Sequence, residues 1–418
     1  MASSPLRFMF RHPDYMRYFV GMVPIQFGGQ IEAITIAWQV YHIARETMSI
    51  EESAFMVGMV GLCQFVPLFI LTLYAGTLAD RVNRKAIVLW AMLAEIVGVV
   101  GLTLVSMQDA PDLWHIFVVA GLFGGARAFL APAASALVPM LVTRADMPQA
   151  ISLSTTAWMT AVIVGPALGG FLIAVSIPVA YGVTVVTYVL GMALVATIKT
   201  DTTPEWQDGH PLTLLREGLV YVWQNKVVFG AISLDLFAVL LGGATALLPA
   251  FASDILKVGP MGNALLRSAP AVGGLIISAL LVMYPIQRRA GIKMFLGVAA
   301  FGLATIVFAF SQSMVVSLLA LAVLGAGDMI SVNVRQTLIQ IVTPDHMRGR
   351  VSAVSGMFIS GSNELGEFES GVLSRFVGPV MAAAYGGIGT LIITGVWAVW
   401  FPALRKADRL DGKENPDV

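Results

Sequence analysis

The sequence predicts an all-α integral membrane protein that crosses the bilayer twelve times. Three observations predict this fold: 57% of the 418 residues are hydrophobic, only 12% are charged, and the mean hydropathy is +0.81. A soluble domain carries roughly 25% charged residues, because its surface must face water. About half of that charge is missing here, so most of the surface must face lipid.

Twelve apolar segments are long enough to span a bilayer, which needs about 20 apolar residues per helix. A polar stretch over 199–226 separates the first six from the last six. We therefore predict a bundle over 1–198, a cytoplasmic linker over 199–226, a second bundle over 227–404 and a cytoplasmic tail over 405–418. The predicted spans are 18–43, 54–79, 86–106, 113–140, 148–174, 179–198, 227–252, 262–285, 291–310, 314–341, 350–373 and 380–402.

The placement of lysine and arginine predicts the orientation. With both termini in the cytoplasm, nineteen of the 25 basic residues lie in cytoplasmic segments, four lie outside and two lie within spans. This asymmetry follows the rule that cytoplasmic loops are enriched in Lys and Arg. We expect a multi-pass protein of the bacterial inner membrane, with the lipid bilayer as its surroundings.

Composition also excludes several kinds of site. The net charge is zero, so nothing indicates a nucleic-acid partner, and Cys63 is the single cysteine. The sequence contains no metal-ligand spacing, no phosphate-binding Gly-rich loop and no nucleophile–base pair. We therefore expect no metal, no cofactor and no enzymatic activity. We also expect a monomer.

The two halves repeat each other at an offset of 200 residues. Gly125-Ala126 matches Gly325-Ala326, Val142-Thr143 matches Val342-Thr343, and Ser152 matches Ser352. These matches share one place in each half, the turn between its fourth and fifth spans. Two pseudo-symmetric six-helix bundles around a central substrate site are the design that this repeat predicts.

One loop carries a recognisable motif. Between spans two and three stands Gly76-Thr77-Leu78-Ala79-Asp80-Arg81-Val82-Asn83-Arg84-Lys85. It resembles the signature loop of the major facilitator superfamily, Gly-x-Leu-Ala-Asp-Arg-x-Gly-Arg-Arg/Lys. We expect Gly76 to allow a close helix approach. Asn83 replaces the second glycine, and asparagine tolerates a left-handed backbone. A degenerate second copy, Gln287-Arg288-Arg289-Ala290-Gly291, follows span eight.

A second motif lies in span five, where the chain reads Gly165-Pro166-Ala167-Leu168-Gly169-Gly170. It resembles the Gly-Pro-x-x-Gly-Gly core of superfamily exporters that exchange substrate for protons. Pro166 removes one helix hydrogen bond, and Gly165, Gly169 and Gly170 allow a close, bendable helix contact. Ordinary packing of small residues is the alternative reading.

The resemblance extends over essentially the whole chain. Trp38–Tyr41, Pro132-Ala133, Leu137–Pro139 and Ser362–Gly371 are similar to the transmembrane secretion effector branch, whose best-known member is the enterobactin exporter. The resemblance implies an exporter of small amphipathic molecules, a siderophore or a drug, that works by alternating access with proton coupling. An importer of the same fold, and a membrane scaffold or sensor without transport, are the alternatives.

Ionisable residues within the spans are candidate coupling or substrate sites, because a charge at mid-span costs about 2.5–3.5 kcal/mol or more. Glu32 in span one is the first choice and Asp235 in span seven the second. The resemblance matches Arg127 to a span-four arginine implicated in proton coupling, and the 200-residue offset suggests that Asp328 faces it. Glu95, in a peripheral span, we assign to packing. The candidate set is Glu32, Arg127, Asp235, Asp328, Arg335, Glu364 and Glu367.

Glu364 and Glu367 lie three residues apart on one face of span eleven. Two like charges there repel, so we expect one to be protonated or paired with Arg335 of span ten. For every candidate, a polar group or ion pair that only fixes packing is the alternative.

Overall fold

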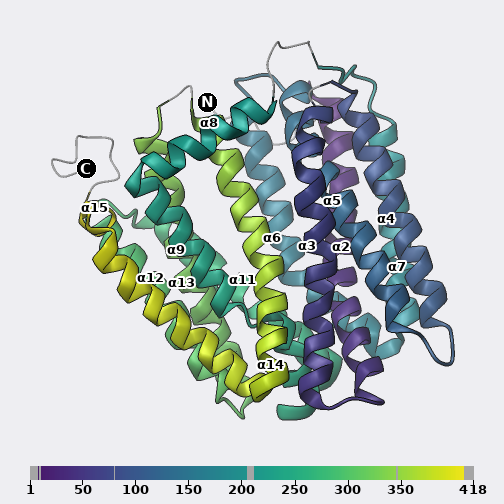
Figure 1. Cartoon of the computed structure of the whole chain (residues 1–418). Helices are drawn as coiled ribbons and strands as arrows, with labels where there is room; N and C mark the ends of the chain where they lie inside the picture. The colour runs from purple at the N-terminus through teal and green to yellow at the C-terminus, as the bar shows by residue number, and fades with distance from the viewer. Residues whose placement is uncertain (1–7, 9–10, 80, 205–210, 345–346, 409–418) are drawn as a thin grey trace. The chain divides into compact units, whose positions relative to one another are not determined.

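The structure is a computed structural model that describes residues 8, 11–79, 81–204, 211–344 and 347–408. Within these ranges every regular element is a helix and no strand is present (Figure 1). Eleven of the described helices are long and apolar enough to cross a membrane. The all-α membrane architecture expected from the sequence is confirmed.

The first half of the chain forms six long helices. They are α2 (Pro13–Arg45), α3 (Ile50–Ala79), α4 (Arg84–Ser106), α5 (Leu113–Leu141), α6 (Met147–Val175) and α7 (Ile177–Ala196).

The second half begins with a helix in the predicted linker, α8 (Pro211–Gln224). The following elements are α9 (Lys226–Gly242), η1 (Thr245–Leu247), α10 (Leu248–Ala250), η2 (Phe251–Ile255), α11 (Gly259–Met283), α12 (Ala290–Ala309), α13 (Met314–Val342), α14 (Arg348–Trp400) and α15 (Pro402–Lys406). The predicted span 227–252 is thus interrupted after Gly242, where the helix gives way to short 3-10 and π segments.

Helix α14 joins two predicted spans, 350–373 and 380–402, into one element of 53 residues. Only Gly378 departs from helical geometry, with φ at 81° and ψ at 159°. This backbone region is open to glycine alone at low cost, and Pro379 then starts a new helical arm without needing its missing N–H. If the two arms of α14 are counted separately, the eleven described membrane-length helices correspond to twelve spans, as expected.

Polar side chains cap several helices at the predicted loops. Asp112 accepts a hydrogen bond from the N–H of Trp114 at the start of α5, and Ser176 accepts one from Val179 at the start of α7. Asn225 accepts from both Val227 and Val228 at the start of α9. These acceptors satisfy the first N–H groups of a helix, which have no partner inside it.

Exposed apolar side chains run along the outer faces of the helices. On α4, the exposed residues Trp90, Val97 and Leu104 follow one another at intervals of seven, whereas Glu95 of the same helix is buried. This is the reverse of a soluble helix, which turns its polar face outward. The chain is therefore a multi-pass membrane protein, and on α4 the one acidic side chain is held inside the helix packing.

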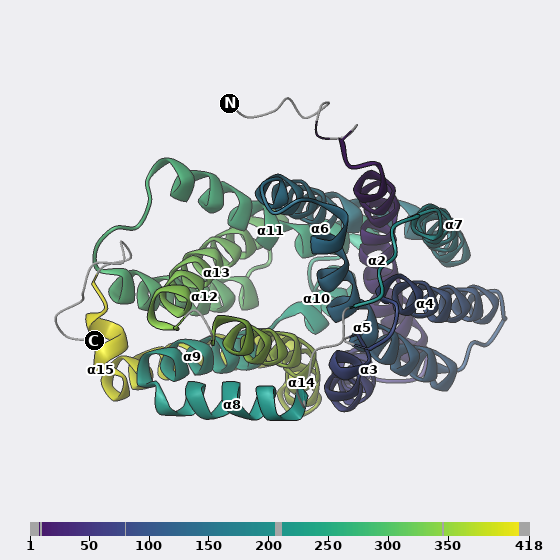
Figure 2. The same cartoon turned by 90° about the horizontal axis from the view of Figure 1, so that it is seen from above.

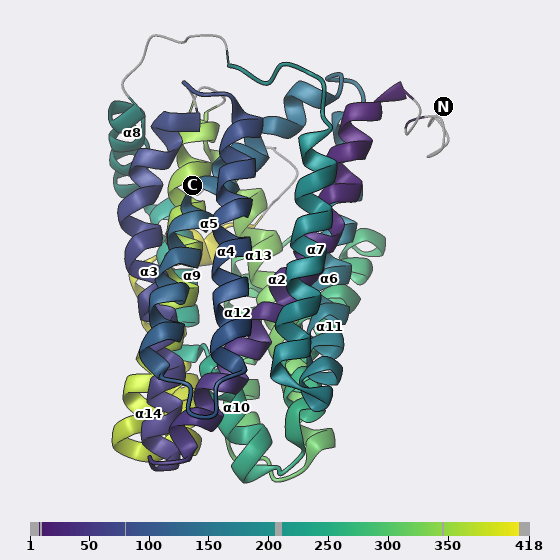
Figure 3. The same cartoon turned by 90° about the vertical axis from the view of Figure 1, so that its right-hand side faces the viewer.

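The chain divides into two compact units. Unit 1 contains Met1–Ile43 and Cys63–Asp208, and unit 2 contains Ala44–Leu62 and Gly209–Val418. In unit 1, α4 packs against α5 and α7 (Figure 3). In unit 2, α13 packs against α11 and α12, and α9 packs against α14 with α8 beside them (Figure 2). The division into bundles over 1–198 and 227–404 stays a prediction.

Glycine sets the close crossing of α3 and α5 in unit 1. A Cβ placed on Gly124 would overlap the backbone carbonyl of Gln64, which has little freedom to move. We expect Gly124→Ala to lower the free energy of unfolding by about 1–3 kcal/mol, the usual cost of overpacking. Thermal unfolding of the purified protein in detergent measures this effect.

Gly182 on α7 is the matched control, because a Cβ there has no neighbour within 4 Å. Gly182→Ala should keep the melting temperature or raise it slightly, since alanine favours a helix over glycine by about 1 kcal/mol. Equal melting temperatures for the two variants would contradict the predicted crossing.

Candidate functional site

Unit 1 contains a buried ion pair between its first and fourth spans. Arg127 Nη2 of α5 lies 3.2 Å from Glu32 Oε1 of α2. The hydroxyl of Tyr188 on α7 donates a hydrogen bond of 2.7 Å to the other carboxylate oxygen, Oε2. The Glu32 side chain is 1% exposed and that of Arg127 is 33% exposed. Glu32 therefore points into the helix packing, and Arg127 is the member of the pair that reaches an open surface.

Two further side chains complete this cluster. Gln64 of α3 accepts a hydrogen bond of 3.0 Å from Arg127 Nη1. Glu95 of α4 is buried, interacts with the Tyr188 hydroxyl and lies within electrostatic range of both Glu32 and Arg127. We refer to Glu32, Gln64, Glu95, Arg127 and Tyr188 as the unit 1 cluster. It combines two carboxyl groups with one guanidinium, so one carboxyl has no cationic partner within the cluster.

Small residues bring the helices of this cluster together. Gly28 of α2 lies against Thr187 and Tyr188 of α7 so closely that a side chain at Gly28 would overlap them. Gly165 of the span-five motif packs onto Gln30, and Gly169 packs onto Ile31 and Ile34, on the turns of α2 that flank Glu32. Pro166 and Gly170 are buried in the same stretch of α6. The span-five motif therefore supports the part of α2 that carries Glu32.

Unit 2 has a cluster of the same kind. Asp235 of α9 forms an ion pair with Arg335 of α13, and both side chains are buried. Asp328, two turns earlier on α13, lies within electrostatic range of both. We refer to Asp235, Asp328 and Arg335 as the unit 2 cluster. As in unit 1, a carboxyl on one helix meets an arginine on a helix later in the chain, and a second carboxyl is left over.

This pairing differs from one sequence expectation. The sequence leads us to expect that one of Glu364 and Glu367 is protonated or paired with Arg335; the structure pairs Arg335 with Asp235. The reason is that Asp235 is as deeply buried as Arg335, whereas both glutamates on α14 are half-buried. Roles for Glu364 and Glu367 stay predictions, as does the expectation that Arg127 faces Asp328.

The signature loop departs from expectation at Asn83. Asp80 lies outside the described residues. A Cβ placed on Gly76 would have no described neighbour within 4 Å, and the close helix approach expected there stays a prediction. Asn83 has φ at −52° and is not left-handed. Its side-chain oxygen instead accepts a hydrogen bond of 3.1 Å from the N–H of Ala86 and caps α4.

Asn83 also binds the chain that follows α7. Its Oδ1 accepts a hydrogen bond of 2.8 Å from the Thr202 hydroxyl, and its Nδ2 donates to Thr203 Oγ1 at 3.2 Å. Thr202 also accepts two hydrogen bonds from the start of α4. Its carbonyl oxygen accepts from the Arg84 N–H and its Oγ1 from the Lys85 N–H, at 3.2 Å each. The residue that replaces the family's glycine thus attaches the loop to the start of the predicted linker.

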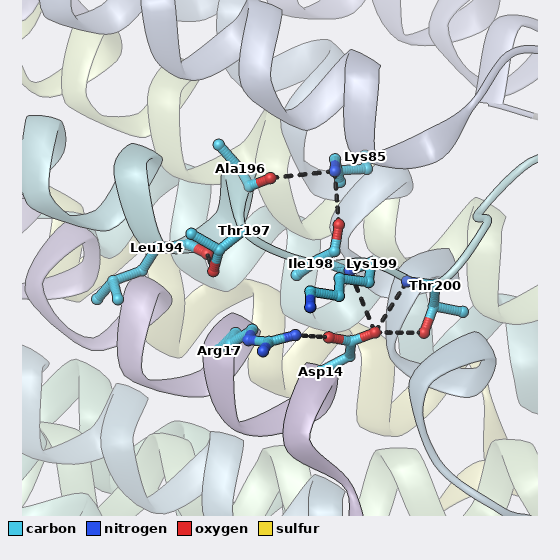
Figure 4. A network of polar contacts seen from close by, with 9 residues as sticks. All are labelled: Asp14, Arg17, Lys85, Leu194, Ala196, Thr197, Ile198, Lys199 and Thr200. Carbon is cyan, nitrogen blue, oxygen red and sulfur yellow. Dashed lines mark hydrogen bonds and ion pairs between the residues drawn. The ribbon is translucent and has the colours of Figure 1, made fainter.

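Two neighbouring contacts strengthen this attachment (Figure 4). Lys85 Nζ donates to the carbonyl oxygens of Ala196 and Ile198 at the end of α7, at 3.1 and 2.7 Å. Asp14, at the start of α2, accepts from the backbone N–H and the hydroxyl of Thr200 at 2.8 and 2.6 Å, and forms an ion pair with Arg17. Residues 196–203 are therefore fixed to the starts of both α2 and α4.

The remaining basic residues of the loop differ in their surroundings. Arg84 Nη1 donates to the carbonyl oxygen of Ala136 near the end of α5, at 2.9 Å. Arg81 is exposed.

Two carboxyl groups outside the spans are stabilised in their charged form. Hydrogen bonds from His12 and then Thr143 hold the pKa of Asp146 below its ordinary value, and Arg11 adds to this effect. Hydrogen bonds from the hydroxyl and N–H of Thr203 lower the pKa of Asp201. Both groups belong to the same membrane face as residues 196–203, and Asp146 joins the start of α6 to the residues before α2.

Several members of the unit 1 cluster are absent from the set of candidates that the sequence suggests. Glu95 was assigned to packing because its span was expected to be peripheral, and Gln64 and Tyr188 were not singled out. A signal was present for Glu95, since it is the only acidic residue in a long apolar helix. The described residues contain no group of three or more potential metal ligands.

The profile of the transmembrane secretion effector family matches residues 9–416. Two relatives are similar over most of the chain. The enterobactin exporter EntS of Shigella boydii serotype 18 is 27% identical over 341 residues, which cover 81% of this chain and 80% of that protein. The multidrug efflux pump Tap of Mycobacterium tuberculosis is 27% identical over 412 residues, 95% of each chain.

Solved structures with the same fold have much lower sequence identity. A D-xylose–proton symporter superposes with a TM-score of 0.74 at 14% identity, covering 97% of this chain and 100% of that one. A POT family transporter in complex with a thioalcohol-conjugated peptide has a TM-score of 0.71 at 12% identity, covering 92% and 96%. These similarities establish the fold.

The ion pair between Arg127 and Glu32 should contribute to the free energy of unfolding. Arg127→Met leaves the buried Glu32 carboxylate without its cation, and we expect a loss of about 3 kcal/mol, the lower end for a broken buried pair because Arg127 is partly exposed. Adding Glu32→Gln removes the uncompensated charge and should restore most of the loss. Denaturant unfolding of the wild type, both single variants and the double variant measures the coupling.

Arg144→Met is the control, since Arg144 is exposed outside the spans and a surface substitution changes stability by about 0.5 kcal/mol or less. Additive losses in the double variant would show that Glu32 and Arg127 do not interact.

Proposed function

Because the chain belongs to the transmembrane secretion effector family of the major facilitator superfamily, and is a transporter and not an enzyme, we propose that it exports small amphipathic molecules in exchange for protons. The observation that carries the proposal is the unit 1 cluster, in which two buried carboxyl groups share one arginine. We place the protein in the bacterial inner membrane, as a monomer with both termini in the cytoplasm.

The charge count of the cluster supports proton coupling. With Glu32 and Glu95 both ionised, the cluster would carry one uncompensated negative charge away from water, which is strongly unfavourable. One bound proton removes that charge. A cluster that must hold or release a proton whenever water reaches it has the property that a proton-coupled transporter needs.

The geometry also supports a route for that proton. Arg127 is the partly exposed member of the cluster, and its guanidinium contacts both Glu32 and Gln64. Tyr188 donates to Glu32 and interacts with Glu95, so it links the two carboxyl groups. We propose that Glu32 and Glu95 share one bound proton. The proton is released when Arg127 pairs with Glu32 and no longer contacts the other members of the cluster.

The span-five motif supports export driven by movement of α2. Gly165 and Gly169 form the contact between α6 and the Glu32 region of α2. Because α6 contributes only glycine to this contact, α2 can slide or bend against it with few side chains to repack. Displacement of α2 at this contact would change the distance between Glu32 and Arg127, and this coupling joins proton release to the switch between the two access states.

The relatives support the kind of substrate. One is an enterobactin exporter and the other a multidrug efflux pump. A siderophore and drugs are small molecules with both apolar and polar groups, so we propose this amphipathic class for the present chain. Asp235, Asp328 and Arg335 of unit 2, with Glu364 and Glu367 on α14, are the proposed contacts for polar groups of the substrate or for a second proton.

A transport assay tests the role of Glu32. In proteoliposomes with an imposed pH gradient, Glu32→Gln should reduce proton-driven substrate accumulation at least tenfold, because an amide cannot take up and release the proton. Exchange of labelled for unlabelled substrate without a gradient should continue, since this exchange needs the conformational switch but no net proton movement.

Glu46→Gln is the control, because Glu46 is an exposed glutamate in the loop after α2. It should leave both assays unchanged. Proton-driven accumulation by Glu32→Gln at the wild-type rate would rule out Glu32 as the coupling residue.

The direction of transport is a separate prediction. In inverted inner-membrane vesicles energised to be acidic inside, an exporter accumulates its substrate in the lumen, and we expect accumulation of a fluorescent amphipathic cation or a labelled siderophore that collapses when the pH gradient is dissipated. Right-side-out vesicles with the outside acidified, prepared from the same cells, should not accumulate the compound. The opposite pattern would identify an importer of the same fold, and the absence of transport in both vesicle types would favour a scaffold or sensor.

A further inference from the structure

A group of exposed basic residues forms where the start of α12 meets the end of the described chain. Arg288 and Arg289 precede α12, and Lys293 lies in its first turn. Arg405 and Lys406 form the last turn of α15. All five side chains are exposed. We refer to these residues as the basic corner of unit 2; α15 follows the last arm of α14, the yellow end of the chain in Figure 1.

Backbone contacts hold the two segments of the corner together. The N–H of Gly291 donates to the carbonyl of Ala407 at 2.9 Å, and the N–H of Arg289 donates to Asp408 Oδ1 at 2.8 Å. Gly291 lies so close to the carbonyl of Leu404 that a side chain at this position would overlap it. Arg289 has φ at 54°, a backbone region that non-glycine residues rarely occupy. The five cations are therefore gathered by the fold.

The described residues of the two segments do not balance the charge of the corner. Among the described residues of the two segments, Asp408 is the one carboxylate, and one of its oxygens already accepts the Arg289 N–H. A concentration of guanidinium and ammonium groups of this kind attracts an anion with several acceptor oxygens, such as a phosphate.

The surface beside the corner is apolar. On α12, the exposed side chains Ile292, Leu296, Leu303 and Val307 share one face, which begins beside Lys293. On the second arm of α14, Ile388, Ile392, Val399 and Trp400 form a second exposed stripe. The two helices are neighbours, because Gly302 of α12 packs against the backbone of Gly387. Two adjacent apolar stripes thus end at one basic corner, with Trp400 close to the boundary.

We propose that the basic corner is a binding site for an anionic phospholipid. Its phosphate binds Arg289, Lys293, Arg405 and Lys406, and its acyl chains lie along the stripes of α12 and α14. The gathered cations favour an anionic headgroup over a neutral one, and the apolar stripes that end at the corner favour a ligand with acyl chains over a free phosphate. Basic clusters next to a span, with an aromatic residue at the interface, are suited to anionic lipid headgroups.

The proposal also accounts for the degenerate second copy of the signature loop. Residues 287–291 keep the arginines of the motif but lack its acidic residue, and Asp408 from a distant segment contacts the backbone in its place. Arginines can set the orientation of a chain in the membrane without any defined contact. The hydrogen bond between Asp408 and the Arg289 N–H therefore points to a further role for these arginines. The inference depends on the chain spanning a membrane and not on the proposed substrate or on proton coupling.

Native mass spectrometry tests the site directly. The purified protein is incubated with equal amounts of phosphatidylglycerol and phosphatidylcholine, and the ratio of the two retained lipids is measured. Wild type should retain phosphatidylglycerol preferentially, and Arg289→Gln/Arg405→Gln should weaken that preference roughly 25-fold, at about fivefold for each cation. The preference should also fall as ionic strength rises.

Two comparisons keep the result decisive. Arg216→Gln/Lys226→Gln removes two exposed cations of the same unit outside the corner and should retain the wild-type ratio. Gly291→Ala keeps every charge but separates the two segments, and should also weaken the preference. If the corner variant retains phosphatidylglycerol as well as the Arg216/Lys226 variant does, the proposal is wrong. Full competition by glycerol 3-phosphate would overturn it in favour of a soluble phosphate ligand.

Discussion

A buried charge in a lipid-solvated protein needs a counter-charge on a neighbouring helix, and this constraint organises both units. Water cannot solvate Arg335, which is 2% exposed, so its guanidinium pairs with Asp235 across two helices. Arg127 pairs with Glu32 in the same way. The pairs fix the rotation of each helix about its axis, because turning α2 or α9 by half a turn would place a carboxylate in lipid at a cost of several kcal/mol.

The close helix crossings follow from the same constraint. An ion pair of about 3 Å between two helices is possible only if the neighbouring contacts allow the backbones to approach. In unit 1 these contacts are made by Gly28 against Tyr188 and by Gly165 against Gln30. Apolar side chains give little association between helices in lipid, so close packing and polar contacts supply the specificity. Glycine and the buried ion pair are thus two parts of one arrangement.

The sequence predicted those features that depend on one helix at a time. Span positions follow from apolar length, and Glu32, Arg127, Asp235 and Arg335 follow from the rarity of charge within a span. The partners of these residues depend on the facing of helices, which composition does not encode. For this reason the sequence offers Glu364 or Glu367 as a partner for Arg335, or a protonated glutamate in its place, and predicts only packing for Glu95. Gly378 lies between the predicted spans 350–373 and 380–402, yet the chain is helical on both sides of it, because the break is a single glycine residue.

The substitution at Asn83 shows how a departure from a family pattern changes what a loop contacts. Glycine at this position would permit a left-handed turn but would offer no side chain to Thr202 and Thr203. Asparagine gives up that freedom, caps α4 and binds both threonines. Together with Lys85 and Asp14 it makes residues 196–203 part of unit 1 and not a slack connection. Residues 199–203 therefore belong to unit 1, and in the proposed alternating access they would move together with the starts of α2 and α4. The signature loop, which carries Asn83 and Lys85, would move with the same helix ends.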